Sequence, residues 1–434
     1  MSPLCNDQVK QLLFKVIDSL LEQRDVFLSN PKTDFTRSKK ISFRQTMLYP
    51  MVAGNDNGET EMVKFFGEKA PFNSAMIQRR KQIKTEAFME LFYRFNNSFI
   101  NIKTLSGYQL VACDGSRLNL PYNPSDPETF IHCIKDRRGI NQTHLNCLYD
   151  LLNDYFLDVE LQGIHQMDEK GAFCNLVHKQ MVSKPVHKQI FMADRGYASY
   201  NIFAHMIHNN QLFLIRVPEA FAETICKSCE DWLATDWADE VIIVHIGRCN
   251  TKEHRQLENY HNIPSKGHYD FIEAGSDETD KLLLRVLKFP LSDGNYEYVV
   301  TNLPEYAFSA ATIKKLYHLR WGEETAFRHL KYAGNMVHLH STIKDFLIQE
   351  IYAKFTMYNF SAFLTAAVHI MRSDDEKHRY VINHTQAQKS CILFLRGEIE
   401  DIRSLLRRYL VPVRPGRVFE RNLRRQSADT LTYR

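Results

Sequence analysis

One stretch of the chain, residues 317–331 (YHLRWGEETAFRHLK), constrains the fold more than any other. It has the spacing of an amphipathic helix packed on a core. Apolar residues in and beside it share one side: Leu316, Leu319, Ala326, Phe327 and Leu330. At about 100° per residue, four polar residues fall within roughly 60° of one another on the other side. This stripe carries a hydroxyl, a guanidinium, a carboxylate and an ammonium, from Tyr317, Arg320, Glu324 and Lys331.

Two adjacent acids in this run are predicted to point in different directions. Glu324 falls on the polar stripe, whereas Glu323 points about 100° away from it. A carboxylate among groups that bind phosphate suggests a metal ligand beside a nucleic-acid backbone. The same residues also fit a solvated helix face with ordinary ion pairs, and the run alone leaves both interpretations open.

Two aspartates follow short apolar runs elsewhere in the chain. Residues 110–113 (LVAC) lead into Asp114, and residues 190–193 (IFMA) lead into Asp194. Each run is typical of a buried strand, and each aspartate suits the position where a strand ends. Either aspartate alone could simply start a turn. Two of them, followed by a glutamate on a helix, form a more specific arrangement.

These motifs together resemble a known family. The triplet Asp114, Asp194 and Glu324, with a Tyr-x2-Arg-x3-Glu-x6-Lys pattern around the glutamate, resembles the DDE transposases of bacterial insertion sequences. The match is to the branch, the IS-four type, that this tyrosine–arginine–glutamate–lysine signature defines. Trp321 after the arginine is also usual there. The resemblance covers about residues 70–370.

The carboxylates predict a particular chemistry. Two divalent ions about 4 Å apart can activate the attacking oxygen and stabilise the leaving oxygen of a phosphodiester. Three carboxylates supply hard oxygen ligands for such ions. We therefore expect Asp114, Asp194 and Glu324 to be catalytic and to bind two Mg²⁺ ions, for which Mn²⁺ would substitute.

The resemblance implies a function and further site residues. It implies a DNA transposase that binds the inverted-repeat ends of its element, excises the element and joins its 3′-hydroxyl ends to target DNA, often through a hairpin. Tyr317, Arg320 and Lys331 would grip the DNA, with Trp321 and Arg328 as further candidates. A flipped base could stack on Trp321, Trp232 or Trp237, although core packing explains each tryptophan equally well. A homodimer in the DNA complex is also implied.

The chain of 434 residues is long enough for two or three structural units. Residues 1–100 are predicted to be a helical, DNA-end-binding domain. Residues 101–342 alternate strands and helices, which predicts an α/β fold, and the resemblance implies a ribonuclease H-like mixed sheet with a β-rich insertion at about 218–305. Residues 343–434 are predicted to be helical and end in an arginine-rich tail.

Charge and apolar patterning bear on partners and compartment. The net charge is only +4, so DNA binding rests on local basic clusters, such as residues 32–44 and 79–84, rather than on the total. The N-terminus lacks the layout of a signal peptide, and residues 351–371 fit a buried helix better than a membrane span. We expect a cytoplasmic protein without a membrane partner, associated with the nucleoid when bound to DNA.

Some alternatives stay open at the level of sequence. Nine cysteines without framework spacing suit a reducing compartment. Four residues could form a zinc site, although unligated thiols are the simpler interpretation: Cys226, Cys229, Cys249 and His254. The competing functions are a general two-metal nuclease and a catalytically silent relative that only occupies DNA ends.

Overall fold

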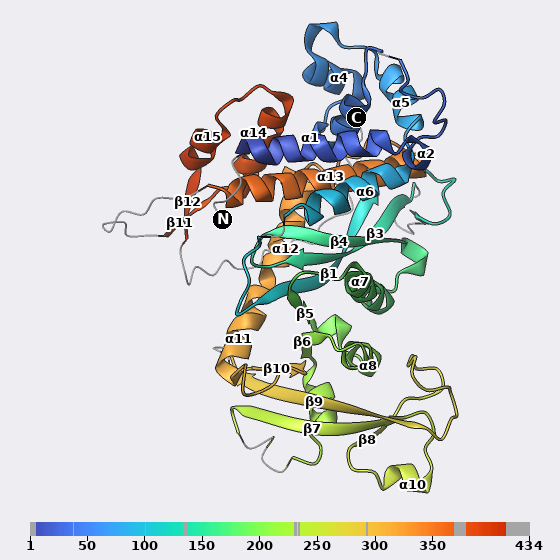
Figure 1. Cartoon of the computed structure of the whole chain (residues 1–434). Coiled ribbons are helices and arrows are strands. Elements are labelled where there is room, and N and C mark those ends of the chain that lie inside the picture. The colour runs from blue at the N-terminus through green and yellow to red at the C-terminus, as the bar shows by residue number, and fades with distance from the viewer. Residues whose placement is uncertain are drawn as a thin grey trace.

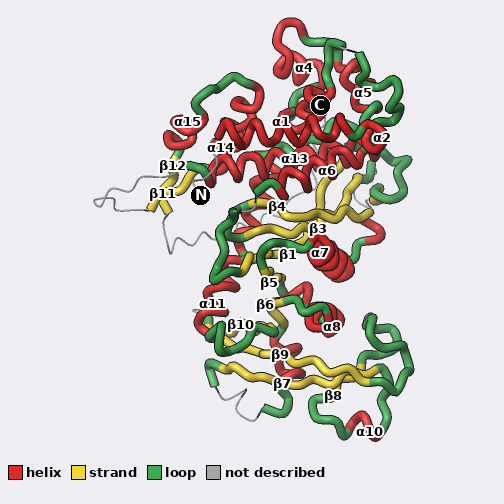
Figure 2. The backbone as a smooth tube through the Cα atoms, viewed as in Figure 1, coloured by secondary structure: helices red, strands yellow, loops and turns green. Residues whose placement is uncertain are grey.

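The computed structural model describes residues 6–413, apart from residues 38, 100, 133–137, 230–231, 233–234, 292–293 and 369–378. The predicted arginine-rich tail beyond residue 413 lies outside this range. A helical region occupies one end of the molecule and a long sheet extends to the other (Figure 1), as colouring by secondary structure also shows (Figure 2). No helix in the described part of the chain is both long enough and apolar enough to cross a membrane.

A mixed sheet of ten strands forms the centre of the molecule. Five strands carry the site, in the spatial order β4, β3, β1, β5, β6. Their bounds are Tyr155–Gly163, Ile140–Asp150, Tyr108–Leu120, Lys188–Ala193 and Leu212–Val217. The first three are antiparallel neighbours, and β5 and β6 run parallel to β1. This is the ribonuclease H-like arrangement expected from the sequence. The short strand β2 (Phe130–Ile131) pairs with the start of β3.

The β-rich insertion extends this same sheet. Strand β10 (Tyr296–Thr301) pairs antiparallel with β6, and β9 (Thr279–Pro290), β7 (Ala238–Gly247) and β8 (Tyr260–Asn262) follow outward in that order. Two short helices, α9 (Glu219–Ile225) and α10 (Lys252–Arg255), lie within the connections. The insertion is therefore continuous with the core strands through backbone hydrogen bonds.

Alternating apolar residues let both faces of the central strands be covered. Val111 and Phe191 pack in a cluster with helices α7 (Glu169–Ser183) and α8 (Tyr200–His208). Their neighbours Leu110 and Ile190 pack in another cluster with helix α11 (Ala310–Leu319). Successive side chains of a strand point to opposite faces, so the four-residue apolar runs seen in the sequence serve both layers.

Helices from both ends of the chain share one core. The long helix α13 (Lys344–Ala366) packs against α3 (Phe43–Val52) and α6 (Thr85–Asn97). Six further helices and turns complete this region: α1 (Asn6–Glu22), α2 (Arg24–Phe27), α4 (Gly58–Phe66), α5 (Asn73–Lys81), α14 (His384–Arg396) and α15 (Ile402–Arg408). A two-stranded sheet of β11 (Arg379–Ile382) and β12 (Leu410–Val413) lies beside them (Figure 1). The predicted N- and C-terminal helical regions thus pack on each other through α13.

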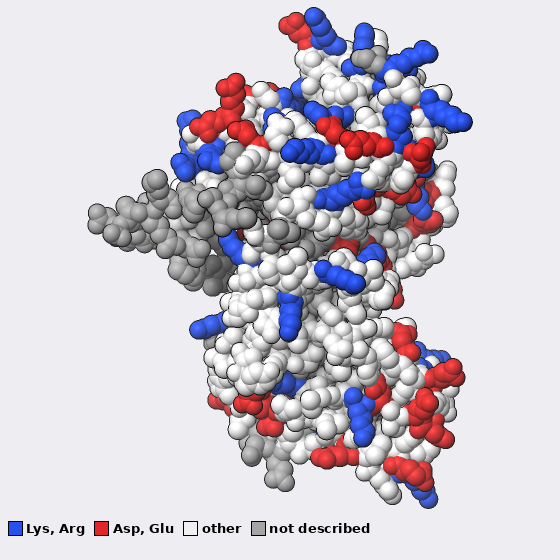
Figure 3. Space-filling model, viewed as in Figure 1, with Lys and Arg blue, Asp and Glu red and all other residues white. Residues whose placement is uncertain are grey.

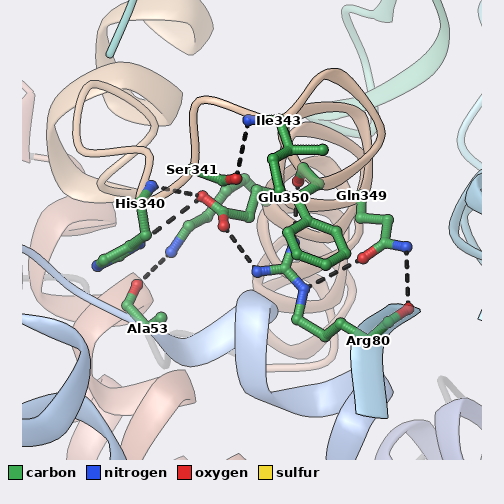
Figure 4. A network of polar contacts seen from close by, with 9 residues as sticks. Ala53, Arg80, His340, Ser341, Ile343, Gln349 and Glu350 are labelled. Carbon is green, nitrogen blue, oxygen red and sulfur yellow. Dashed lines mark hydrogen bonds and ion pairs between the residues drawn. The ribbon is translucent and has the colours of Figure 1, made fainter. Parts of the chain in front are cut away.

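Buried polar residues join the two helical regions. The Arg80 guanidinium in α5 donates a hydrogen bond to Glu350 in α13 (2.8 Å), and the backbone N–H of His340 donates to the same carboxylate (2.8 Å; Figure 4). Lys354 in α13 donates to the carbonyl of Ala53. Because every charged group in this network has a partner, α13 can be buried along most of its length although it carries polar residues.

Candidate active site

Strand pairing places the two predicted aspartates side by side. The parallel register of β1 and β5 ends with Cys113 opposite Ala193, so Asp114 and Asp194 occupy the next position on neighbouring strands. Asp194 leaves the sheet and caps a short turn, η3 (Arg195–Tyr197), where its carboxylate accepts the N–H of Gly196 (2.8 Å).

The prediction that the first strand ends at Asp114 is wrong. Strand β1 continues to Leu120 because β3 supplies hydrogen-bonding partners along its other edge, with Asp114 opposite Cys147. Only the parallel pairing ends there. Asp114 therefore lies within a strand, at the point where its neighbour on one side has turned away.

The helix of the signature run is interrupted. Helix α11 ends at Leu319, α12 (Trp321–Arg328) begins after Arg320, and a π-helical turn, η4 (His329–Ala333), follows. A single regular wheel therefore does not describe residues 317–331. Ala326, Phe327 and Leu330 are buried as predicted, but Leu319 is 43% exposed, contrary to the prediction.

Glu323 and Glu324 have different surroundings on α12. Glu323 lies near Asp114 and is completely buried, whereas the Glu324 side chain is 40% exposed. Burial, followed by the nearby Asp114, raises the pKa of Glu323 well above its usual range. Its carboxylate lies beside the main chain of Asp114, but neither oxygen accepts a hydrogen bond of good geometry from the described residues.

Glu324 and Arg320 form an ion pair at the edge of the carboxylate cluster. The distance from Arg320 Nη2 to Glu324 Oε1 is 3.0 Å, with the guanidinium buried and the Glu324 side chain 40% exposed. Burial raises the pKa of Asp114 to about 6. The N–H of Gly115 opposes this rise, Asp194 adds to it, and Arg320 and Glu324 have smaller, opposite effects. Asp114 thus lies close enough to Asp194, Arg320 and Glu324 for their charges to affect it.

The other signature residues surround this unit. Lys331 donates to Ser116 Oγ (2.7 Å) and to the carbonyl of Arg117 (2.5 Å), both on β1. Tyr317 is 1% exposed and its hydroxyl has no partner among the described residues. Trp321 is about half exposed, with the Arg320 guanidinium 5.7 Å from its ring. Arg328 is exposed on α12.

The two other tryptophans differ in exposure. Trp232 is buried and packs near Tyr298, with ring centroids 6.2 Å apart, so core packing accounts for it. Trp237 is about half exposed and lies under Lys314.

Residues that sequence reasoning missed lie on the far side of Asp114. His144 on β3 is buried, and its Nε2 lies 3.1 Å from Glu169 Oε1. A Cβ at Gly115 would come within 2.5 Å of that nitrogen, so a larger residue there would displace the His144 or Glu169 side chain. Nothing in the sequence marks His144, because its position depends on the β1–β3 register, which brings it opposite Arg117.

Unsatisfied polar atoms gather around the carboxylates. The hydroxyls of Tyr197 and Tyr317 and the Nε of Arg320 are buried without a hydrogen-bond partner in the described chain, as are both oxygens of Glu323. Buried polar groups are normally paired, and exceptions call for an explanation such as an absent ion or ligand. These unpaired groups are consistent with a ligand or ion at this position.

The donor chemistry fits divalent cations, although the ligands are not gathered around one point. No three His, Cys, Asp or Glu side chains in the described residues are close enough to hold a metal ion as they stand. The carboxylates of Asp114, Asp194 and Glu324 are the hard oxygen ligands that Mg²⁺ prefers. Glu324 is engaged by Arg320, so it would have to exchange that partner for a cation.

The cysteines and histidine considered for zinc are not arranged as a site. Both ring nitrogens of His254 face backbone carbonyls, at 3.1 Å from Cys249 and 3.0 Å from Asp277. Cys226 and Cys229 lie next to each other at the end of α9. Among the described residues no His, Cys, Asp or Glu group suited to a metal contains them.

The fold and the carboxylate cluster define a ribonuclease H-like protein with an acidic site at the junction of β1, β5 and α12. Comparison with known families is specific: residues 105–360 match the transposase DDE domain. That match spans more than half of the chain, which therefore belongs to this family.

Two further comparisons add little. No curated protein matches the chain. Among solved structures, the chain is similar to the piggyBac transposase in its synaptic complex with hairpin DNA, at 9% identity and a TM-score of 0.47. The similarity covers 93% of this chain and 81% of the other. At this level nothing about the partners of this chain follows from it.

Proposed function

We propose that this protein is a DNA transposase that cleaves the ends of its own element and joins the 3′-hydroxyl ends to target DNA. The observation that carries the proposal is that Asp114 and Asp194 directly follow the last paired residues of the parallel strands β1 and β5, with Glu324, Arg320 and Lys331 close to Asp114. A solvated helix face would leave these residues exposed, but Arg320 is 5% exposed and points into the cluster.

Asp114, Asp194 and Glu324 would hold two Mg²⁺ ions, or Mn²⁺ in their place. Such ions supply Lewis-acid stabilisation of the phosphodiester and lower the pKa of a bound water. Glu324 would exchange Arg320 for a cation. The guanidinium would then be available for a phosphate oxygen, which it can bind bidentately.

Lys331 and Tyr317 would hold the cleaved strand. Lys331 is fixed to β1 near Asp114, where its ammonium can contact a phosphate next to the ions. The unpaired hydroxyl of Tyr317 can donate one further hydrogen bond once a strand is in place. Trp321 and Arg328, both exposed on α12, would contact the same strand. A hairpin at the element end would use an exposed ring, for which Trp321 and Trp237 are suited and the buried Trp232 is not.

End recognition and assembly belong to the helical region. The N-terminal helices up to residue 100 would bind the inverted repeats, and a homodimer through the region beyond residue 343 would bring two ends together in the cytoplasm. Basic and acidic side chains are interspersed on the face drawn in Figure 3, so the coloured residues of that face do not suggest one continuous DNA track.

A DNA-cleavage assay tests the proposal. The substrate is linear DNA carrying the inverted repeats that flank the gene, incubated with the full chain and Mg²⁺. We expect cleavage at the element ends that disappears with excess chelator. Full cleavage in chelator would exclude the two-metal mechanism. Specific end binding by wild-type protein without any cleavage would instead support the silent end-binding relative.

A further inference from the structure

Glu323 occupies an unusual place for a charged residue. It lies in the first turn of α12 with no exposed surface, next to Asp114 on one side. Cys113 and Cys147, on β1 and β3, lie close enough for its charge to affect their pKa values. The side chain is therefore enclosed between the helix and the sheet, on the inner side of the acidic cluster.

No basic side chain satisfies this carboxylate. Arg320 is nearby but directs its hydrogen bond to Glu324, and its own Nε has no partner. Lys331 is committed to Ser116 and Arg117 on β1. A buried carboxyl group without hydrogen bonds is costly, and an apolar residue would fill the same space without that cost.

A second buried acid shows that burial alone does not explain Glu323. Glu297 on β10 is also buried and also has one oxygen without a partner, but Arg216 lies 3.6 Å from its other oxygen. Glu323 forms no ion pair with the described residues, because Arg320 lies near it but pairs with Glu324. A cation beside Asp114 would supply the positive charge that this buried carboxylate lacks.

We propose that Glu323 is a fourth carboxylate of the cation site, which supplies an oxygen ligand from the buried side while Asp114, Asp194 and Glu324 act from the open side. The inference rests on the proposed function, since it places Glu323 in the same ion-binding cluster. This inference differs from the sequence prediction, in which Glu324 was the only one of the two adjacent acids expected to be a metal ligand.

Mn²⁺ binding to the DNA-free full chain tests this inference without a measurement of activity. Mn²⁺ affinity is determined by electron paramagnetic resonance for wild type, Glu323→Gln, Asp114→Asn and the matched control Glu297→Gln. Loss of a group that supports a metal typically weakens binding 10–100-fold. We expect Glu323→Gln to weaken Mn²⁺ binding by about tenfold or more, and Glu297→Gln to leave it unchanged.

The variants separate the possible failures. Wild-type Mn²⁺ affinity in Glu323→Gln, with weakened binding in Asp114→Asn, would overturn the role of Glu323 and leave the proposed function standing. Wild-type affinity in both would mean that the acidic cluster does not bind the cation, so the proposed site itself fails. A merely structural Glu323 would change the melting temperature but not the affinity of the folded protein.

Glu323→Asp is a second variant that keeps the test possible. If Glu323→Gln does not fold, the same titration is made on Glu323→Asp, which keeps the charge but draws the carboxylate back by one methylene. Weaker Mn²⁺ binding is then expected, and wild-type affinity would overturn the proposal.

Discussion

Two glutamates of this protein are almost equally buried but have opposite surroundings. Glu350 in α13 is 2% exposed and is held by Arg80 and by the backbone of His340 (Figure 4). Glu323 in α12 is fully buried and has no hydrogen-bond partner of good geometry in the described chain. Burial alone would raise the pKa of Glu350, but Arg80 and His340 outweigh it and lower that pKa to about 2. The pKa of Glu323 is raised instead.

The difference distinguishes a structural network from a site that awaits a ligand. The network around Glu350 satisfies its buried charges internally, so it helps to fix how the N- and C-terminal helices pack. The acidic cluster leaves charges and hydrogen-bonding groups unpaired, which costs stability and is explained if cations and DNA complete it. The comparison can be tested by neutralising an acid in each region.

The largest effect is expected from Asp114→Asn. The cleavage rate should fall by much more than 10–100-fold, the loss that is typical when an outer-shell metal residue is removed, because Asp114 is expected to be a direct ligand. The unfolding free energy without metal should be unchanged or higher, since an acid in a poorly compensated cluster is neutralised. Cleavage and urea denaturation on the same preparation check both points. A large loss of stability would contradict the distinction between the regions.

Glu350→Ala should show the reverse behaviour. It leaves the Arg80 guanidinium buried without its counter-charge, and breaking a buried ion pair in this way costs about 3–5 kcal/mol. Urea denaturation should show this loss. The Mn²⁺ affinity of the folded fraction should not change, because the network lies in the helical region. An exposed pair, Arg44 with Asp18, serves as a control, and Asp18→Ala should cost at most about 1 kcal/mol.

Lowering the pH should change the stability contributions of Glu350 and Asp114 in opposite directions. The pKa of Glu350 is lowered from 4.5 to about 2, so its contribution is present above its usual pKa and is lost as the pH falls from about 4.5 to 2. That contribution is about 3 kcal/mol. The pKa of Asp114 is raised from 3.8 to about 6, so its contribution is present at low pH and is lost as the pH rises through 6.

Unfolding of metal-free protein between pH 3 and 8 would measure both effects. Asp114→Asn should flatten the profile near pH 6, and Glu350→Ala should flatten it below about pH 4.5. If Asp114→Asn left the region near pH 6 unchanged, the electrostatic description of the cluster would be wrong.

The sequence predicted the two strands and the helix that carry these acids for identifiable reasons. Short apolar runs before Asp114 and Asp194 are interpretable because parallel strands buried on both faces need uninterrupted apolar residues. The helical position of Glu324 followed from spacing alone. These features depend on local pattern.

Features that depend on distant pairing were missed. The extension of β1 beyond Asp114 depends on β3, and the position of His144 depends on their register. The break at Arg320 and the π-helical turn make a regular wheel inapplicable to the whole run, so Leu319 was placed on the wrong side. Local periodicity contains no signal for either interruption.

Lys331→Ala should have a smaller effect on DNA binding than loss of an acid has on cleavage. Losing one phosphate contact lowers the slope of log affinity against log salt by about one unit, uniformly across DNA sequences. Arg320→Ala should do the same if its guanidinium turns to DNA. Lys315 is exposed on helix α11, outside the signature positions, and Lys315→Ala is the control. Equal slopes for Lys331→Ala and wild type would remove Lys331 from the DNA contacts.

The smallest effect is expected from Tyr317→Phe, which tests whether the buried Tyr317 hydroxyl donates a hydrogen bond to bound DNA. The hydroxyl makes no hydrogen bond in the described chain, so its removal should not lower the unfolding free energy of the protein without DNA. If a DNA phosphate accepts its hydrogen bond, the loss is about 0.5–1.5 kcal/mol, or roughly two- to twelvefold in affinity for the cleaved end. Tyr197→Phe serves as a comparison, because its hydroxyl is also buried but lies near Cys113 on η3, outside the signature run. Binding of end DNA by both variants and by wild type is measured at one salt concentration. Wild-type affinity for Tyr317→Phe would show that the Tyr317 hydroxyl is not a DNA contact.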